Sequence, residues 1–236
     1  MKKKMLPSIH MPILCFGVFV LCASTLRADN ASSGFSDRFD LNVNDRKAGM
    51  SLDGLAVENG SGKWTVHQGT AVITEKGTVS VQKWWDHSQA SVPASMSASD
   101  AILSADIRPF TCDWIAVAFL AKAGSLDWFS DDNQLWVYLK SNGFVQLWQG
   151  KKAMVTVYGP PAFDPSVYHA LSMVFNAVSN SVAVSLDGVE IIKPLDLGGF
   201  HPRVEAAGFR INRNPNGQQA GAPQIDNFKC EFTQNK

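Results

Sequence analysis

The amino-acid sequence predicts an all-β protein built as a two-sheet antiparallel β-sandwich. Roughly a dozen short segments alternate apolar and polar residues with a period of two, which is typical of strands that bury one face. Clusters of Gly, Pro, Asn and Asp separate these segments about every 8 to 12 residues, a spacing typical of a sandwich or jelly roll. No segment of any length shows the periodicity of an amphipathic helix.

Strands in the first half of the chain are predicted from their alternation. Leu103, Ala105 and Ile107 alternate with polar residues, so 101–108 predicts a strand with one buried face. Residues 114–123 are apolar except for Lys122, as in a central strand covered on both sides. The other strands expected in this half cover 35–41, 63–66, 70–74 and 78–85. The polar stretch 42–62 and the Ser-, Ala- and Pro-rich stretch 88–100 are expected to be irregular.

In the second half, a hairpin at residues 134–149 is the most informative stretch. Its turn contains Asn142-Gly143, a strong hairpin signal. A three-residue loop, 141–143, pairs Val137 with Leu147 and Trp136 with Trp148, which keeps one face aliphatic and the other aromatic and polar. A two-residue loop would mix the faces, so we predict the three-residue loop with Gly143 in the left-handed conformation.

A second hairpin is predicted at residues 181–192, around a two-residue Asp187-Gly188 turn. This turn pairs Leu186 with Val189 and Val184 with Ile191. Further strands are expected in segments bounded by Gly- and Pro-rich turns, at 151–158, 168–175, 204–212 and 224–232. The acidic, aromatic stretch 124–133 and the Gly/Asn/Gln-rich stretch 213–223 are expected to be loops.

The aromatic side of the first hairpin is a candidate ligand-binding surface. It presents Trp136, Tyr138, Gln146 and Trp148 together. Flat aromatic rings beside an amide suit the apolar faces and hydroxyl groups of a sugar. The alternative is a second core, because tryptophan is usually largely buried and both faces of such a strand can be covered.

Other side chains extend this candidate site. Arg210 and Asn212 share the polar side of a late strand and carry hydrogen-bond donors for sugar hydroxyls. Trp84, Trp85 and Trp128 fall in or beside loops and could form a rim, or could simply anchor those loops.

The N-terminus has the pattern of a secretory signal peptide. Lys2, Lys3 and Lys4 precede a short apolar run, 11–23, and small residues follow near Ala28. The sequence therefore predicts a signal peptide at 1–28 and one domain at 29–236, secreted or periplasmic, with no membrane span in the mature chain.

Removal of this segment changes the charge of the chain. Loss of the three lysines and Arg27 lowers the basic residues from 21 to 17 against 21 acidic ones, a net charge of −4. No basic patch stands out, so nucleic acid is a poor candidate partner. Two cysteines, Cys112 and Cys230, remain. An exported protein permits a disulfide between them, worth roughly 4 to 5 kcal/mol on the chain-entropy model, and the alternative is two separate buried thiols.

Four segments together resemble the concanavalin A-like lectin/glucanase superfamily. They are FSDRFD near the start, ILSADIRPF in the middle, YHALSMVF followed by SVAVSLDGVEI, and PQIDNFKCEF at the end. The laminin-G-like jelly rolls common in secreted bacterial proteins are the most similar members. The resemblance implies one convex and one concave sheet, with carbohydrate bound across the concave face or its rim loops.

The same resemblance implies a possible structural Ca²⁺ at Asp226. In several members an Asp just before the last strand holds calcium together with backbone carbonyls near the first strand, and Asp226 in QIDNF matches that position. The alternatives are that Asp226 caps a turn or pairs with Arg38.

The pattern of catalytic residues is absent. Retaining hydrolases of this superfamily carry E-x-D-x-x-E on one strand, and none of the five glutamates of the chain lies in such a motif. No G-x-S-x-G, Walker, H-E-x-x-H or C-x-x-C motif occurs either. We therefore expect a non-catalytic carbohydrate-binding domain. A glycan-active hydrolase or lyase, and a protein-interaction or structural module of the envelope, are the alternatives.

Overall fold

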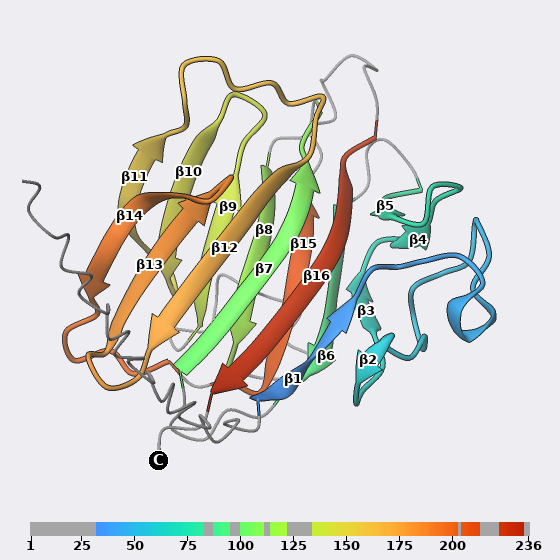
Figure 1. The fold of residues 1–236 in the computed structure, drawn as a ribbon, viewed down its shortest axis with the longest axis horizontal. Helices are drawn as coiled ribbons and strands as arrows, with labels where there is room; N and C mark the ends of the chain where they lie inside the picture. The colour runs from blue at the N-terminus through green and yellow to red at the C-terminus, as the bar shows by residue number, and fades with distance from the viewer. Residues whose placement is uncertain are drawn as a thin grey trace, which may run out of the picture.

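A computed structural model shows a β-sandwich of two antiparallel sheets, as the sequence predicts (Figure 1). The structure describes residues 32–82, 87–94, 100–110, 114–121, 134–202, 204–212 and 222–233. These residues hold sixteen strands and one 3₁₀ turn, η1 (Val43–Asp45), and no α-helix. Within the described ranges no helix is long and apolar enough to cross a membrane.

The nine-stranded sheet lies in front in Figure 1 and has the main strand order β14-β13-β12-β7-β16-β1-β2. Beside this path β5 pairs with β16, and β4 pairs with β5. The strands are β1 (Ser32–Asp37), β2 (Asn59–Gly60), β4 (Val72–Ile73), β5 (Val79–Ser80), β7 (Asp100–Arg108), β12 (His169–Asn176), β13 (Ser181–Leu186), β14 (Val189–Asp196) and β16 (Gln224–Thr233).

The seven-stranded sheet lies behind it, in the order β11-β10-β9-β8-β15-β6-β3. Its strands are β3 (Thr65–Gln68), β6 (His87–Pro93), β8 (Trp114–Leu120), β9 (Leu135–Leu139), β10 (Phe144–Gln149), β11 (Lys152–Tyr158) and β15 (Ala206–Asn212). Every residue of β8 is buried, which confirms the prediction of a central strand covered on both faces.

The hydrophobic core lies between the sheets and is formed by alternate residues of each strand. Leu103 of β7 and Val137 of β9 are fully buried in it. Trp64 lies between aromatic rings of both sheets, with its ring centroid 5.3 Å from those of Phe209 and Phe228. The period-two pattern therefore correctly identifies the inner faces.

The β9–β10 hairpin has the predicted register. Val137 pairs with Leu147 and Trp136 with Trp148. The Lys140 N–H donates to the Phe144 carbonyl at 2.8 Å, and the Gly143 N–H donates to the Lys140 carbonyl at 3.0 Å. Gly143 has φ +78°, the left-handed conformation that this loop requires.

The β13–β14 hairpin differs from the prediction at one pair. The Asp187-Gly188 turn and the pairing of Leu186 with Val189 are as predicted. Val184, however, pairs with Ile192 rather than Ile191, because a bulge shifts the register by one residue. Ile192 is buried, whereas Val189, next to the turn, is 64% exposed.

The segment 88–100, expected to be irregular, contributes β6 instead. β6 pairs along its length with β15 and also pairs with β3, and these backbone hydrogen bonds outweigh the weak strand propensity of Ser and Ala. β1 also ends earlier than expected, at Asp37, because Phe39 takes a left-handed conformation with φ +57° and leaves the strand direction.

A buried ion pair organises the chain after β1. The Arg46 guanidinium donates to both oxygens of Asp37, and neither side chain is exposed. Asp37 also accepts hydrogen bonds from the Trp64 indole at 2.7 Å and from the Phe39 backbone N–H at 2.9 Å. Arg46 binds Glu58 at 3.1 Å as well. This network ties the long segment between β1 and β3 to the core.

Candidate functional site

The outer face of the seven-stranded sheet carries a continuous layer of aromatic rings. Strand register places Ala118, Trp136 and Trp148 in one row and Ala116, Tyr138 and Gln146 in the next. Alanine leaves space beside each larger ring of β9. The layer, which we call the aromatic face, consists of Trp114, Trp136, Tyr138, Phe144, Trp148 and Tyr158.

These rings contact one another in sequence across the sheet. Trp136 and Trp148 stack with centroids 5.0 Å apart, and Trp114 stacks on Tyr138 at 5.8 Å. Phe144 stacks on Tyr138 at 6.3 Å and meets Tyr158 edge to face at 5.3 Å. Each ring therefore restricts its neighbour, so the face is ordered before any ligand arrives.

The Gln146 amide holds two rings of the aromatic face and is itself anchored to β11. Its Oε1 accepts hydrogen bonds from the Tyr138 hydroxyl and from the Trp148 indole, the latter at 2.8 Å, and its Nε2 donates to Thr156 at 2.7 Å. The Trp136 indole donates instead to the Gly150 carbonyl at 3.1 Å. The structure thus assigns Gln146 a positioning role, and its predicted contact with ligand stays a prediction.

Exposure increases from the centre of the aromatic face to the β11 edge. Trp136 is 1% exposed and Tyr138 is 8% exposed, whereas Trp148 and Phe144 are half-buried and Tyr158 is 77% exposed. Trp136 and Tyr138 therefore form the second core that was the alternative interpretation of this face. Access for a ligand is greatest on the β10–β11 side.

Arg210 and Asn212 lie on the same outer face as the rings. In the strand register Arg210 is beside Ala116, and Asn212 is beside Trp114. The Arg210 guanidinium lies 5.5 Å from the centre of the Trp114 ring, within cation–π range. The structure thus brings all six predicted ligand-binding residues to one face. Trp84, Trp85 and Trp128, the predicted rim, lie outside the described residues.

Trp114 was not singled out from the sequence, because residues 114–121 are all apolar and give no sign of which side chains point outward. The orientation of Trp114 follows only from the strand register, because β8 pairs with β9 and places Ala116 beside Tyr138. Trp114 precedes Ala116 by two residues and so shares its face.

The strands of this sheet that the structure describes contain no carboxylate side chain. None of the seven described strands, β3, β6, β8, β9, β10, β11 and β15, includes Asp or Glu. Glycoside hydrolysis usually requires two carboxyl groups on either side of the scissile bond. A hydrolase acting on this face would have to take them from outside these strands.

Asp226 lies on the outer face of the other sheet, at a β-bulge of β16 opposite Asp106. Burial, followed by the negative charges of Asp106, Asp40 and Glu58, raises the pKa of the Asp226 carboxyl to about 6, although a backbone hydrogen bond from Asn227 opposes the shift. Arg38 pairs with Asp40 at 3.1 Å and with Glu58 at 3.3 Å, and no ion pair joins it to Asp226 in the described part of the chain.

The fit of Asp226 to calcium is partial. Its carboxylate is an oxygen ligand with surplus negative charge around it, as a hard cation prefers. However, the described side chains include no group of three or more His, Cys, Asp or Glu residues that could hold a metal ion. A calcium ion at Asp226 would therefore depend on backbone carbonyl oxygens for most of its ligands.

Cys230 is a free and fully buried thiol in the core. Burial raises the pKa of this thiol far above its usual range, so it stays protonated. The structure does not support the predicted disulfide bond. Cys112 lies outside the described residues.

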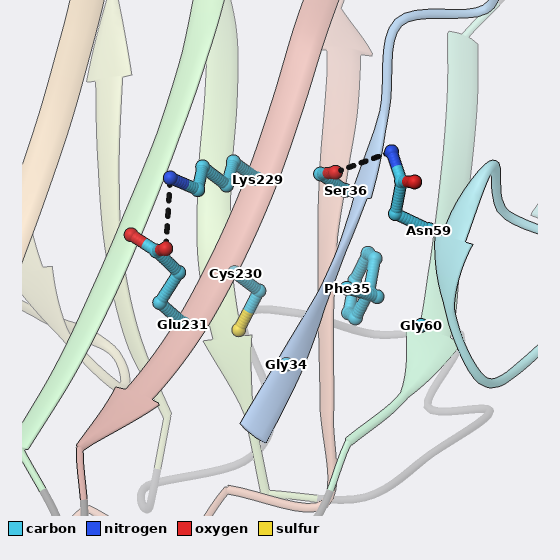
Figure 2. Close-up of a pocket in the computed structure, with 8 residues that line it drawn as sticks. All are labelled: Gly34, Phe35, Ser36, Asn59, Gly60, Lys229, Cys230 and Glu231. Carbon is cyan, nitrogen blue, oxygen red and sulfur yellow. Dashed lines mark hydrogen bonds and ion pairs between the residues drawn. The ribbon is translucent and has the colours of Figure 1, made fainter. Parts of the chain in front are cut away.

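A shallow groove of about 140 Å³ lies on the outer face of the nine-stranded sheet, where β1 runs between β16 and β2 (Figure 2). Gly34 is required here, because a Cβ would lie 2.1 Å from the Cys230 carbonyl oxygen. Figure 2 shows that its polar side chains bond in pairs, Asn59 to Ser36 at 3.2 Å and Lys229 to Glu231 at 2.8 Å. The polar side chains of the groove therefore already bond to each other, which makes the groove a weaker candidate for a ligand site.

Comparison with solved structures identifies the architecture. A carbohydrate-binding module, CBM66 from Bacillus subtilis, aligns with a TM-score of 0.51 at 14% identity over 79% of this chain and 99% of its own. Winged bean acidic lectin complexed with methyl-α-D-galactose aligns with a TM-score of 0.57 at 10% identity, over 87% of this chain and 100% of its own. The chain has a lectin-like jelly-roll fold.

A third structure is a protein of unknown function with a galectin-like fold from Bacillus subtilis. It aligns with a TM-score of 0.53 at 14% identity, over 86% of this chain and 98% of its own. No protein-family model and no curated protein sequence matches the chain. At such low identity these likenesses establish the fold, and the function has to be argued from the site.

Proposed function

We propose that this chain is an exported, non-catalytic domain that binds carbohydrate on the accessible side of its aromatic face. The observation that carries the proposal is the ordered row from Trp148 and Phe144 to Tyr158, with rings held by stacking and by the Gln146 amide. The basic and apolar N-terminal segment supports the export part of this proposal.

The chemistry of this face supports a sugar ligand. A pyranose or furanose ring has an apolar face that packs on an aromatic ring and hydroxyls that pair with amides and guanidinium groups. Rings that are already fixed lose little conformational entropy on binding, which favours affinity. The absence of carboxylates from the seven described strands of this sheet supports binding rather than hydrolysis.

The test is a glycan array with the mature domain, comparing the native chain with Trp148→Ala. Trp148 is half-buried, so we expect the variant to fold and to bind its glycan at least about tenfold more weakly, the loss typical of an aromatic anchor. Trp148→Phe should retain most binding. The matched control is Tyr168→Ala, which changes an exposed tyrosine directly before β12 of the nine-stranded sheet and should leave affinity unchanged.

The array and a turnover assay on the same glycans separate the alternatives. Product release would indicate a hydrolase or lyase and contradict the non-catalytic proposal. No binding to any glycan would favour a protein-interaction or structural module of the envelope, with the aromatic face serving only as a second core.

A structural calcium ion at Asp226 belongs to the same proposal. The like charges around Asp226 would be relieved by a bound cation, so added calcium is expected to raise the melting temperature by several degrees over the value in EDTA. Asp226→Asn should abolish this response. An identical melting temperature in calcium and in EDTA would contradict the calcium site.

A further inference from the structure

A concave site lies at the edge of the sandwich, beside the aromatic face. A cavity of about 260 Å³ opens between the end of β11 and the β13–β14 turn. β11 and β14 are edge strands of opposite sheets. Its walls are Tyr158, Gly159 and Pro160 on one side and Leu186, Asp187 and Val189 on the other. All of these residues are described, and β11 contacts β14 directly.

The cavity has an accessible aromatic platform. The Tyr158 side chain is 77% exposed, and its ring is oriented by the edge-to-face contact with Phe144. Val189, 64% exposed, supplies an apolar wall opposite it. Exposed large apolar side chains gathered in a cavity are typical of a ligand site.

The cavity also has a fixed hydrogen-bond acceptor. One carboxylate oxygen of Asp187 accepts the Ala170 backbone N–H at 2.8 Å, and the other bonds to His169 Nδ1 at 2.8 Å. His169 is held in turn by the Asp164 carbonyl at 2.7 Å and by stacking on Phe163 at 4.1 Å. The Asp187 side chain is still 44% exposed, and each oxygen keeps lone-pair capacity for a ligand hydroxyl.

We propose that this cavity binds a single neutral sugar ring, a proposal that rests on the carbohydrate-binding function of the aromatic face. The ring stacks on Tyr158 and donates hydroxyl hydrogen bonds to Asp187. Its volume is below the roughly 300 Å³ at which pockets for drug-sized ligands begin, so it fits one ring rather than a chain. A carboxylate in the wall disfavours uronates and other acidic sugars by like-charge repulsion.

The position of the cavity connects it to the proposed site. Phe144 contacts both Tyr138 of the aromatic face and Tyr158 of the cavity. A glycan lying along the β10–β11 side of the sheet would therefore place a terminal or branching ring over the cavity.

The test is a two-dimensional amide NMR titration of the mature domain with a panel of neutral methyl glycosides and methyl glucuronide, at millimolar concentrations. We expect at least one neutral glycoside to shift the amides of Gly159 and Val189 saturably. Methyl glucuronide should bind at least tenfold more weakly. If no glycoside shifts these amides, the inference is wrong.

Variants of the cavity sharpen the result. Tyr158→Ala should weaken binding at least tenfold and Tyr158→Phe less than threefold, whereas Asp187→Asn should weaken it about fivefold. Asparagine keeps the turn intact, because Asn-Gly suits the same left-handed geometry. Tyr168→Ala, outside the cavity, is again the matched control.

The glycan array distinguishes the two proposals. Array binding that is lost in Trp148→Ala but unchanged in Asp187→Asn would overturn the cavity inference and leave the proposed function intact, because Asp187 lines the cavity and is not part of the aromatic face. Array binding that is lost in Trp148→Ala and also weakened in Asp187→Asn would support a glycan bridging the face and the cavity. Saturable shifts at Gly159 without any array binding would support the cavity and contradict the aromatic face as the glycan site.

Discussion

Replacing Arg46 by methionine is expected to lower the free energy of unfolding by about 3 to 5 kcal/mol. Arg46 and Asp37 are fully buried, and the substitution would leave the Asp37 carboxylate in the core without its counter-charge. Methionine fills much of the same volume, so the cost arises from the unpaired charge rather than from an empty cavity. Urea unfolding of the purified domain measures it.

Arg38→Met is the matched control for this prediction. Arg38 also pairs with Glu58, but its side chain is 62% exposed, and an exposed ion pair contributes about 1 kcal/mol or less. Equal losses of unfolding free energy in the two variants would show that the buried ion pair stabilises the fold no more than the exposed one. That result would contradict the prediction.

Removing both charges does not restore the stability of the native protein. The Trp64 indole and the Phe39 backbone N–H both donate to Asp37, and an apolar residue at position 37 would leave these buried donors without an acceptor. Each unsatisfied donor costs about 1 to 3 kcal/mol. Asp37 therefore links the charge of Arg46 to the packing of Trp64 at the centre of the core.

The strand pattern and the first hairpin were predictable because local rules determine them. Period-two alternation identifies inner faces, and only one loop length keeps the faces of the 134–149 hairpin pure. The bulge that pairs Val184 with Ile192 instead of Ile191 was not predictable. Both candidate partners are isoleucine, so either register places an apolar residue opposite Val184. β6 was missed for a related reason: its small polar residues form a strand only because β15 and β3 supply hydrogen-bond partners on both sides.

The candidate site was predictable as a set of residues on one face, but not as a set of exposed residues. Alternation placed Trp136, Tyr138 and Trp148 together, whereas their burial depends on rings from neighbouring strands. The edge cavity had no sequence signal of its own. Tyr158 ended a predicted strand and Asp187 occupied a predicted turn. The two residues line one cavity because the chain passes from one sheet to the other between β11 and β12.

Trp136→Ala is expected to cause the second large loss in the free energy of unfolding, because Trp136 lies at the buried centre of the aromatic face. Trp136 is 1% exposed, stacks on Trp148 and donates its indole N–H to the Gly150 carbonyl. Its removal should therefore create a cavity and leave the Gly150 carbonyl without this hydrogen-bond donor. The expected loss is about 3 to 5 kcal/mol in the free energy of unfolding. Trp148→Ala, at a half-buried position of the same stack, should cost about 1 to 2 kcal/mol.

The ratio of these two losses, measured by urea unfolding, decides how much of the aromatic face a glycan can reach. A large loss at Trp136 and a small one at Trp148 would show that the centre of the face is core and that ligand contact is confined to Trp148, Phe144 and Tyr158. Two small losses would show instead that Trp136 becomes accessible in solution. The binding surface would then extend across β9 toward Trp114 and Arg210, which lie on the same outer face.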